Sequence, residues 1–291
     1  MKLLSVPQVS FFFATFASFA VKVKELTVLI IAERLNATRK PIAAALAARD
    51  AGALRDEARR QADAGADYID VNTALSPREE KDLMVWAVDI VCQATDKPVS
   101  VDTADPKTAR AGLALLPKGS AFLNSVSGET GRLEPMLELV AEFETRVVAL
   151  AMDDRGMPNS LDDRWRALER IFAATDKRNI PRERIYVDPL VRPVSTNPEQ
   201  VPQVLGMIRR VREEGGGAKT TCGLSNISFG LPRRGHLNRV FLAMAIGAGL
   251  SSAILDPLAP GMMPTVLAAA CLAGEDAFCM NYITAQRQGR L

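Results

Sequence analysis

Acidic and amide side chains recur along this chain of 291 residues, each in or at the end of a short, mostly apolar run. We predict that each run is a β-strand and that its polar residue marks the strand's C-terminal end. The eight positions are Glu33, Asn72, Asp102, Asn124, Asp153, Asp188, Asn226 and Asp256. Some of them are expected in any protein, because loops that lead into helices use Asp and Asn as caps. A ring of amides and carboxylates with almost no Lys, His or aromatic residue suits a flat heterocycle rich in N–H donors. It suits a phosphate poorly, because a phosphate needs cations or helix N-termini.

The most informative stretch is C-G-L-S-N-I-S-F-G-L-P-R-R, residues 222–234. An apolar strand is predicted from Thr220 to Ile227, turning polar at Ser225 and Asn226. A Gly/Pro loop with two arginines follows, and the apolar run Leu237–Ala248 predicts a helix. Barrel enzymes present side chains to substrates in this way, from a strand end that opens into a loop before a helix. Asn226 taken alone is equally well explained as a turn residue.

Cysteine and histidine chemistry is sparse. No C-x-x-C pair occurs among Cys92, Cys222, Cys271 and Cys279, and the only histidine is His236. These features disfavour a zinc site built from His and Cys, and also a nucleophile activated by histidine. Each cysteine falls in an apolar segment, so we expect reduced, buried thiols of the kind found in cytosolic enzymes.

Eight strand–helix units follow one another from Val28 onward, which is the number that closes a TIM barrel. An open doubly wound sheet would normally carry a Gly-rich fingerprint after its first strand, and A-E-R-L-N-A-T has none. The G-G-G of residues 215–217 precedes a strand, so it is a linker rather than a phosphate cradle. We therefore predict an α/β fold, a single-domain (β/α)8 TIM barrel of residues 28–291, whose strand ends converge on one mouth.

Residues 1–27 are expected to stand apart from the barrel as an apolar extension. They contain Lys2, three consecutive phenylalanines and a small-residue site at Ser18–Ala20, as a signal peptide does. The apolar run is too short and too interrupted for a stable membrane span. The interpretation we favour is a translation start near Val28, because everything after Thr27 is typical of a cytoplasmic enzyme. Lys+Arg 36 against Asp+Glu 34, without a basic block, gives no sign of a nucleic-acid surface.

Six motifs in register carry a family resemblance: I-I-A-E-R-L-N, I-D-V-N, V-S-V-D-T, L-N-S, Y-V-D-P-L and G-L-S-N-I-S-F-G. From Val28 to about Tyr282 the chain resembles the pterin-binding methyltransferases, and most closely the methyltetrahydrofolate:corrinoid protein methyltransferases. The folate domain of methionine synthase and dihydropteroate synthase are more distant relatives. The resemblance implies transfer of the N5-methyl group of methyltetrahydrofolate to or from the cobalt of a corrinoid on a partner protein. It also implies a cytoplasmic homodimer.

The resemblance also implies which residues form the site. The positions that correspond to pterin contacts are Asp102, Asn124, Asp188, Gly223, Ser225, Asn226, Arg234, Glu33 and Asn36. The catalytic role falls to Asn226, whose amide N–H can stabilise the lone pair that develops on N5. No strong general acid is apparent, so the proton for N5 comes either from solvent or through a network containing Asp or Asn. Ala32 stands where relatives usually have Gly, a change that touches no main pterin contact.

The cobalamin is expected on another protein, because the D-x-H-x-x-G signature of base-off cobalamin binding is absent. His236 is then expected to begin a helix rather than to bind cobalt. Two alternatives remain. One is a dihydropteroate synthase-like enzyme, although D-P-L-V-R-P and S-N-I-S lack the cationic residues which that family uses around pyrophosphate. The other is a non-catalytic pterin-binding subunit.

Overall fold

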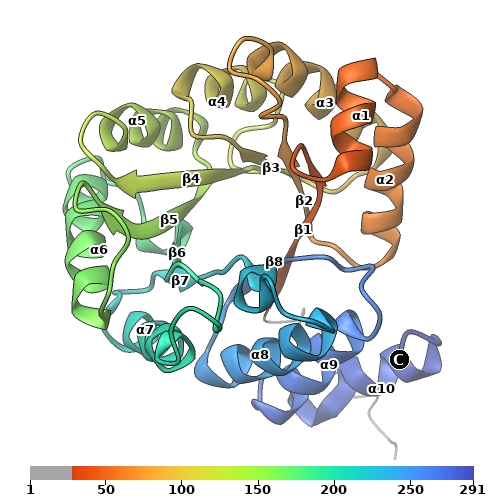
Figure 1. Ribbon diagram of the computed structural model, residues 1–291, viewed down its shortest axis with the longest axis vertical. Helices are drawn as coiled ribbons and strands as arrows, with labels where there is room; N and C mark the ends of the chain where they lie inside the picture. The colour runs from red at the N-terminus through yellow and green to blue at the C-terminus, as the bar shows by residue number, and fades with distance from the viewer. Residues whose placement is uncertain (1–27) are drawn as a thin grey trace, which may run out of the picture.

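The computed structural model describes residues 28–291, so the expectations for residues 1–27 lie outside the described residues. Eight parallel strands form one sheet in the order β7-β6-β5-β4-β3-β2-β1-β8. They are β1 (Leu29–Asn36), β2 (Tyr68–Asn72), β3 (Val99–Asp102), β4 (Phe122–Gly128), β5 (Arg146–Asp153), β6 (Ile185–Asp188), β7 (Lys219–Thr220) and β8 (Ser252–Leu255). Figure 1 shows the strands as an inner ring with the helices outside it.

The ring closes between its last two strands without a full ladder. Gly223 and Ile254 form an isolated parallel bridge, and the Ile254 N–H donates to the Cys222 carbonyl at 2.9 Å. Just before β8 begins, the Ser251 N–H donates to Oγ1 of Thr220, the last residue of β7, at 3.1 Å. These contacts join the end of β7 to β8, so the predicted (β/α)8 TIM barrel is confirmed.

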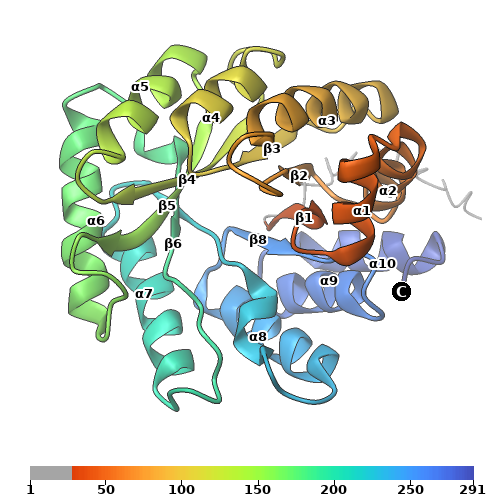
Figure 2. The same ribbon diagram turned by 45° about the horizontal axis from the view of Figure 1, so that its top comes forward.

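Helices alternate with the strands, and the cap residues explain where several of them begin. Asp50 and Asp105 accept hydrogen bonds from the third residue after each of them, and Ser160 forms a capping box with Asp163. The helices are α1 (Lys40–Ala48), α2 (Ala51–Asp63), α3 (Glu80–Ala94), α4 (Pro106–Leu113), α5 (Leu133–Phe143), α6 (Leu161–Asp176), α7 (Gln200–Glu214), α8 (Arg234–Ala248), α9 (Met262–Leu272) and α10 (Met280–Arg287). Figure 2 shows α8, α9 and α10 grouped beside β8.

The predicted seventh strand is wrong beyond Thr220. Residues 224–228 instead form a 3-10 turn, η2 (Leu224–Ser228), followed by a loop into α8. The turn buries Leu224 and Ile227, which are three residues apart, while Asn226 is exposed. Three residues is one turn of a 3-10 helix, whereas a strand would have pointed those two side chains to opposite faces.

Two other strand ends also differ from the predicted ones. Strand β1 continues past Glu33 to Asn36, with an irregular register between Ala32 and Leu35. Strand β4 continues past Asn124 to Gly128. Glu33 and Asn124 therefore lie inside their strands, each of which continues beyond the point where we expected a loop to begin.

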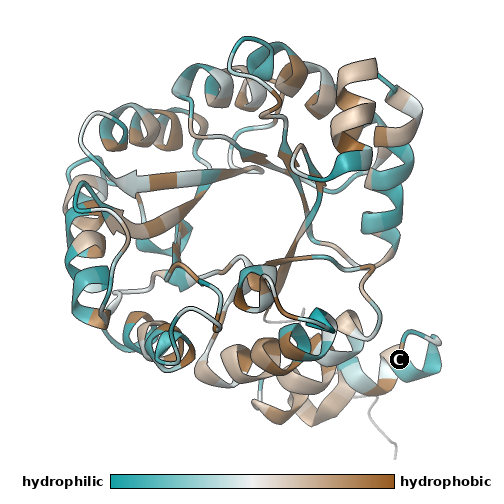
Figure 3. Cartoon of the chain, in the orientation of Figure 1, coloured by the Kyte–Doolittle hydropathy of each residue, from teal (hydrophilic) through white to brown (hydrophobic). Residues whose placement is uncertain are grey.

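The core has two layers. Inside the barrel, Phe122 packs edge-on against Tyr68 and Tyr186, with both ring centroids 4.7 Å from its own. Outside it, apolar residues of the strands pack against the helices, and Figure 3 shows brown, hydrophobic segments along the strands. No helix among residues 28–291 is long and apolar enough to cross a membrane.

The expectation of buried thiols holds only for Cys222. Cys92 and Cys279 are exposed, and Cys271 is half-buried. Val91 lies on the buried side of α3, whereas the side chain of its neighbour Cys92 is exposed and points away from the sheet. An apolar neighbourhood in the sequence therefore did not identify the buried face of a helix.

Candidate functional site

Side chains from β2, β3 and β4 form one hydrogen-bonded group at the barrel mouth. Asn72, Asp102 and Asn124 are register partners on these adjacent strands. Asn72 Nδ2 donates to Asp102 Oδ2 at 3.1 Å, and Asn124 Nδ2 donates to Asp70 Oδ1 at 3.4 Å. The structure thus brings together the two predicted residues Asp102 and Asn124, and it adds Asp70, which the sequence analysis did not single out.

The Asp70 and Asp102 carboxyls hold protons far more readily than free carboxyls do. Burial raises the pKa of Asp70 to about 6. Burial, together with the negative charge of Asp70, raises the pKa of Asp102 well above its ordinary value. The two carboxyls therefore titrate as a coupled pair, and each binds a proton more readily than an ordinary aspartate does.

A second group surrounds Glu33 on the other side of the mouth. Ser225 Oγ donates to Glu33 Oε2 at 3.5 Å. Burial, and next the charge of Asp256, raise the pKa of Glu33 to about 7. Asp256 itself accepts from Arg34 Nη1 at 2.8 Å. A cavity of about 280 Å³ lies here, lined among others by Glu33, Ser225, Arg234 and Asp256. Glu33 is therefore a group that can hold a proton at neutral pH, which its residue type alone did not indicate.

The η2 turn positions Asn226 beside Gly223. A Cβ at Gly223 would lie 3.0 Å from Asn226 Nδ2, which is closer than ordinary packing allows, so the glycine makes room for the amide. Arg234 braces the turn, since its Nη2 donates to the Ser225 carbonyl at 2.6 Å and its Nε to Ser228 Oγ at 3.0 Å. Within residues 28–291 the Asn226 carboxamide has no hydrogen-bond partner, so its donors remain available to a ligand.

Asp188 connects the end of β6 to this turn. Its Oδ1 accepts from the Leu190 N–H at 2.7 Å, and the Gly223 N–H also favours the charged form of its carboxyl. The side chain is buried, and burial raises its pKa to about 6 against the lowering effect of these hydrogen bonds. The D-P-L and G-L-S-N motifs therefore meet at Asp188.

Two polar residues of the ring are already bound by their own loops. Asn36 Oδ1 accepts from the Thr38 N–H at 3.0 Å and from its hydroxyl at 2.7 Å. Asp153 binds Arg155 through both carboxylate oxygens, which lowers its pKa. Asp153 thus binds within its own loop, while the cap of the following helix α6 is Ser160. Asn36 lies at the predicted mouth, but with its acceptor oxygen occupied.

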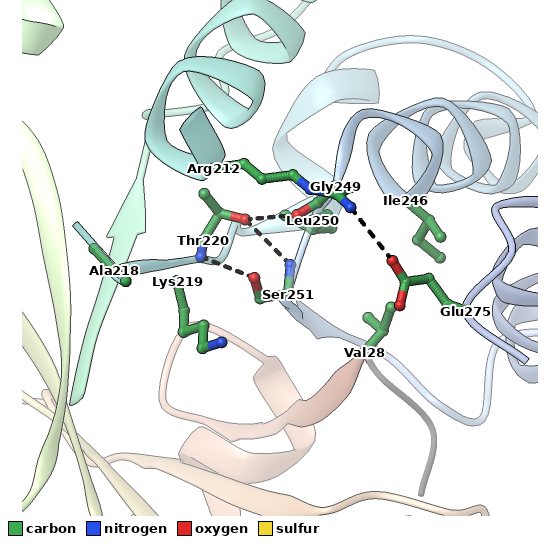
Figure 4. A pocket seen from close by; sticks show the side chains of 11 residues that line it. Val28, Arg212, Ala218, Lys219, Thr220, Ile246, Gly249, Leu250, Ser251 and Glu275 are labelled. Carbon is green, nitrogen blue, oxygen red and sulfur yellow. Dashed lines mark hydrogen bonds and ion pairs between the residues drawn. The ribbon is translucent and has the colours of Figure 1, made fainter. Parts of the chain in front are cut away.

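A different cavity, of about 230 Å³, lies at the opposite end of the barrel, where β1, β7 and β8 begin. Figure 4 shows Arg212 facing Glu275 across it, 3.8 Å apart, and Thr220 bonded to Ser251. Its polar groups largely satisfy one another, and none of the strand-end residues lines it. Active sites of TIM barrels lie at the other face, so we place the candidate site at the mouth.

No group of three or more His, Cys, Asp or Glu side chains in the described part of the chain is placed to hold a metal ion. His236 lies in the first turn of α8, as expected, and its Nδ1 is 3.2 Å from Arg239 Nη2. What the mouth offers a ligand is therefore carboxyl and amide groups.

Comparison with known proteins assigns the family. The family model described as pterin binding enzyme matches residues 32–256, from β1 to the end of β8. The chain belongs to this family. The resemblance inferred from the six motifs is thereby confirmed. The matched segment contains all nine predicted contact residues, from Glu33 to Arg234.

Two curated relatives are at least 32% identical to this chain. The methylcorrinoid:tetrahydrofolate methyltransferase of Eubacterium limosum is 34% identical over 265 residues, which cover 90% of this chain and 97% of that protein. The methionine synthase of Mycobacterium leprae is 32% identical over 242 residues, which cover 79% of this chain but only 20% of that longer protein.

Two solved structures with the same fold are dihydropteroate synthases. The enzyme of Vibrio fischeri superposes with a TM-score of 0.68 at 18% identity, covering 87% of this chain and 94% of that one. The Xanthomonas albilineans enzyme in complex with 7,8-dihydropteroate gives 0.64 at 21% identity, covering 85% and 94%. At these identities the likeness shows the shared barrel fold alone.

Proposed function

We propose that this pterin-binding enzyme moves the N5-methyl group of methyltetrahydrofolate to or from the cobalt of a corrinoid that a partner protein carries. The observation that carries the proposal is the 34% identity to a methylcorrinoid:tetrahydrofolate methyltransferase across nearly the full length of both chains. The mouth supports it, because its carboxyl and amide groups suit a pterin better than a phosphate.

In this proposal the pterin ring is held by Asp102, Asn124 and Asp188. Ionised carboxylates accept hydrogen bonds only, so Asp102 and Asp188 would bind the ring's amino and N–H groups. Asp188 is buried and Asp102 is half-buried, and hydrogen bonds in such surroundings are stronger than in water. Gly223, Ser225, Arg234, Glu33 and Asn36 would line the remaining surface of the ligand.

Asn226 is the proposed catalytic residue. The N5 amine is a poor leaving group unless a hydrogen bond or a proton stabilises its developing lone pair. The unpartnered amide of Asn226 can donate that hydrogen bond without being an acid. Glu33, next to Ser225 and with a pKa raised to about 7, can hold a proton close by. The corrinoid supplies the cobalt that accepts or donates the methyl group, and the chain's own residues orient the folate for in-line displacement.

The partner must reach the mouth from outside. The loop from Phe229 to Gly235 is the proposed contact, because Phe229 is 65% exposed and Arg233 is exposed beside Arg234. We further propose that the enzyme is a cytoplasmic homodimer without a nucleic-acid partner, and that residues 1–27 are not part of the barrel domain of residues 28–291.

The proposal is tested by titrating the purified protein with methyltetrahydrofolate, with and without a cobalt(I) corrinoid acceptor. We expect saturable binding in both cases and loss of the cobalt(I) visible spectrum only when folate and enzyme are present together. Binding without transfer would instead identify a non-catalytic pterin-binding subunit. Condensation of a pterin pyrophosphate with p-aminobenzoate would identify a dihydropteroate synthase, and no folate binding would refute the family-based function altogether.

A further inference from the structure

A fully buried arginine lies behind the site, on α6. Arg164 has 0% of its surface exposed and is among the largest side chains of the core. Burial lowers its pKa to about 10, so it remains a cation at neutral pH. Within residues 28–291 no carboxylate comes within ion-pair distance of it, and its Nη2 has no hydrogen-bond partner. A buried cation without a bonded anion is destabilising unless something nearby offsets it.

The bonds that Arg164 does make converge on the loop after β6. Its Nε donates to the Pro189 carbonyl at 2.6 Å, its shortest hydrogen bond. Its Nη1 donates to Gln203 Oε1 at 2.9 Å and to the Ser160 carbonyl at 3.0 Å. Figure 2 shows α6 and α7, which carry these groups, beside β6. The guanidinium therefore joins both helices to the residue that follows Asp188.

The Pro189 carbonyl and the Leu190 N–H belong to the same peptide group. That N–H donates to Asp188 Oδ1 at 2.7 Å. A continuous path thus runs from the guanidinium, through one peptide group, to the carboxylate. A cation that bonds a peptide oxygen polarises the group and strengthens the hydrogen bond that its N–H donates. Leu190 itself has a left-handed φ of 62°, and the carbonyl of the next peptide group, Leu190 O, accepts from Gln200 Nε2 at 3.4 Å.

We propose that Arg164 is a positioning residue for the pterin site: through the Pro189–Leu190 peptide it orients the Asp188 carboxylate and favours its charged form. The inference rests on the proposed function, in which Asp188 accepts a hydrogen bond from the pterin. This role would explain why the positive charge of Arg164 is buried: a nearby cation stabilises the charged form of a desolvated carboxylate such as Asp188.

Among the groups that affect the pKa of Asp188, the cation is Arg164. The Leu190 and Gly223 N–H groups favour its charged form, and next in effect is the positive charge of Arg164. Cys222, also buried here, has its pKa raised well above the ordinary value and stays neutral. Arg192 lies near enough to lower the pKa of Arg164. Loss of the Arg164 charge should therefore raise the pKa of Asp188.

The test is the affinity for methyltetrahydrofolate as a function of pH, measured by calorimetry or fluorescence between pH 5.5 and 8.5. The variants are Arg164→Gln, which removes the charge, and Arg164→Lys, which keeps it. Arg166→Gln is the matched control, because Arg166 is an exposed arginine on the same helix. For the loss of a nearby opposite charge we take a rise of about one unit in the carboxyl pKa. Affinity of Arg164→Gln should then be about threefold weaker than wild type at pH 6.5 and nearly equal at pH 8.

Arg164→Lys should keep the wild-type midpoint of the pH profile, even if its affinity is weaker at every pH. A loss in Arg164→Gln that is uniform across pH would mean that Arg164 only supports the fold, and an unchanged profile would also overturn the inference. Should Arg164→Gln not fold, a raised midpoint in Arg164→Lys would refute the role of the charge, and an unchanged one would support it. If the wild-type protein binds no folate at any pH, the proposed function has failed, which is a different result from an unchanged midpoint.

Discussion

The raised pKa of Glu33 means that its charged form destabilises the folded state. We therefore predict that Glu33→Gln will increase the free energy of unfolding at neutral pH. Glu33 has a pKa of about 7 in the folded chain, against 4.5 for an ordinary glutamate. The folded state therefore binds the proton more tightly than the unfolded state does. The stabilisation that comes from protonated Glu33 is fully present below pH 4.5 and is lost as pH rises to 7. Glutamine resembles the protonated acid at every pH, so Glu33→Gln does not lose this stabilisation.

The size of the effect follows from the shift. A difference of 2.5 pKa units corresponds to about 3 kcal/mol at pH values above 7. At pH 5 the folded glutamate is almost entirely protonated, and the unfolded one is mostly ionised. The difference there is about 1 kcal/mol. Glu33→Gln should thus exceed the wild type in free energy of unfolding by about 1 kcal/mol at pH 5, rising to about 3 kcal/mol at pH 8.

Guanidinium unfolding, followed by the fluorescence of Trp86 and Trp165, measures this directly on the protein without folate. Asp256→Asn provides a second variant, since the Asp256 charge is one of the two causes that raise the pKa of Glu33. It should reduce the pH dependence without abolishing it. A gain in Glu33→Gln that is the same at pH 5 and pH 8 would show that Glu33 titrates normally, and the argument from burial would then be wrong.

Three further predictions concern the reaction, the chain start and the partner. Asn226→Ala should slow single-turnover methyl transfer roughly ten- to a thousandfold, while folate affinity falls much less, because it removes a bond made mainly in the transition state; an unchanged rate at saturating folate would leave Asn226 as a turn residue. A protein that starts at Val28 should match the full chain in melting temperature and activity, and a loss of several degrees would show that residues 1–27 pack somewhere. Arg233→Glu should raise the Michaelis constant for the corrinoid protein but not for free cobalamin, since an exposed charge acts on encounter with a partner. An equal loss with both acceptors would place Arg233 in the folate site or the fold.

The repeating units made the barrel predictable from sequence. Each apolar run in a parallel barrel is buried on both sides, so it stands out, and its polar terminal residue marks the mouth. The prediction of the seventh strand failed because the apolar residues of C-G-L-S-N-I-S are compatible with either a strand or a 3-10 turn. Only the closure of the barrel by Gly223 and Ile254 decides between them.

Asp70 and Arg164 could both have been found by periodicity. Asp70 precedes Asn72 by two residues, so in a strand its side chain shares the inner face. Arg164 stands three, four and seven residues before Ala167, Leu168 and Ile171, all of which are buried. We did not predict that either residue is buried, because charged residues such as Asp and Arg are usually exposed. How far the pKa values move could not be predicted, since this depends on how completely the closed barrel removes water.

The same desolvation links stability to recognition at the mouth. Raised pKa values at Glu33, Asp70, Asp102 and Asp188 mean that the empty mouth holds protons which free carboxyls would have released. A pterin that donates N–H bonds to Asp102 and Asp188 favours their charged forms and so must expel some of those protons. Glu33 is not among the carboxyls proposed to accept these N–H bonds, so its raised pKa leaves it able to hold a proton near the bound folate. Proton release on folate binding, measured by calorimetry in buffers of different ionisation enthalpy, should therefore be positive at pH 6 to 7 and vanish near pH 8.5. Binding that releases no protons anywhere in that range would show that the pterin is held by groups other than these carboxyls.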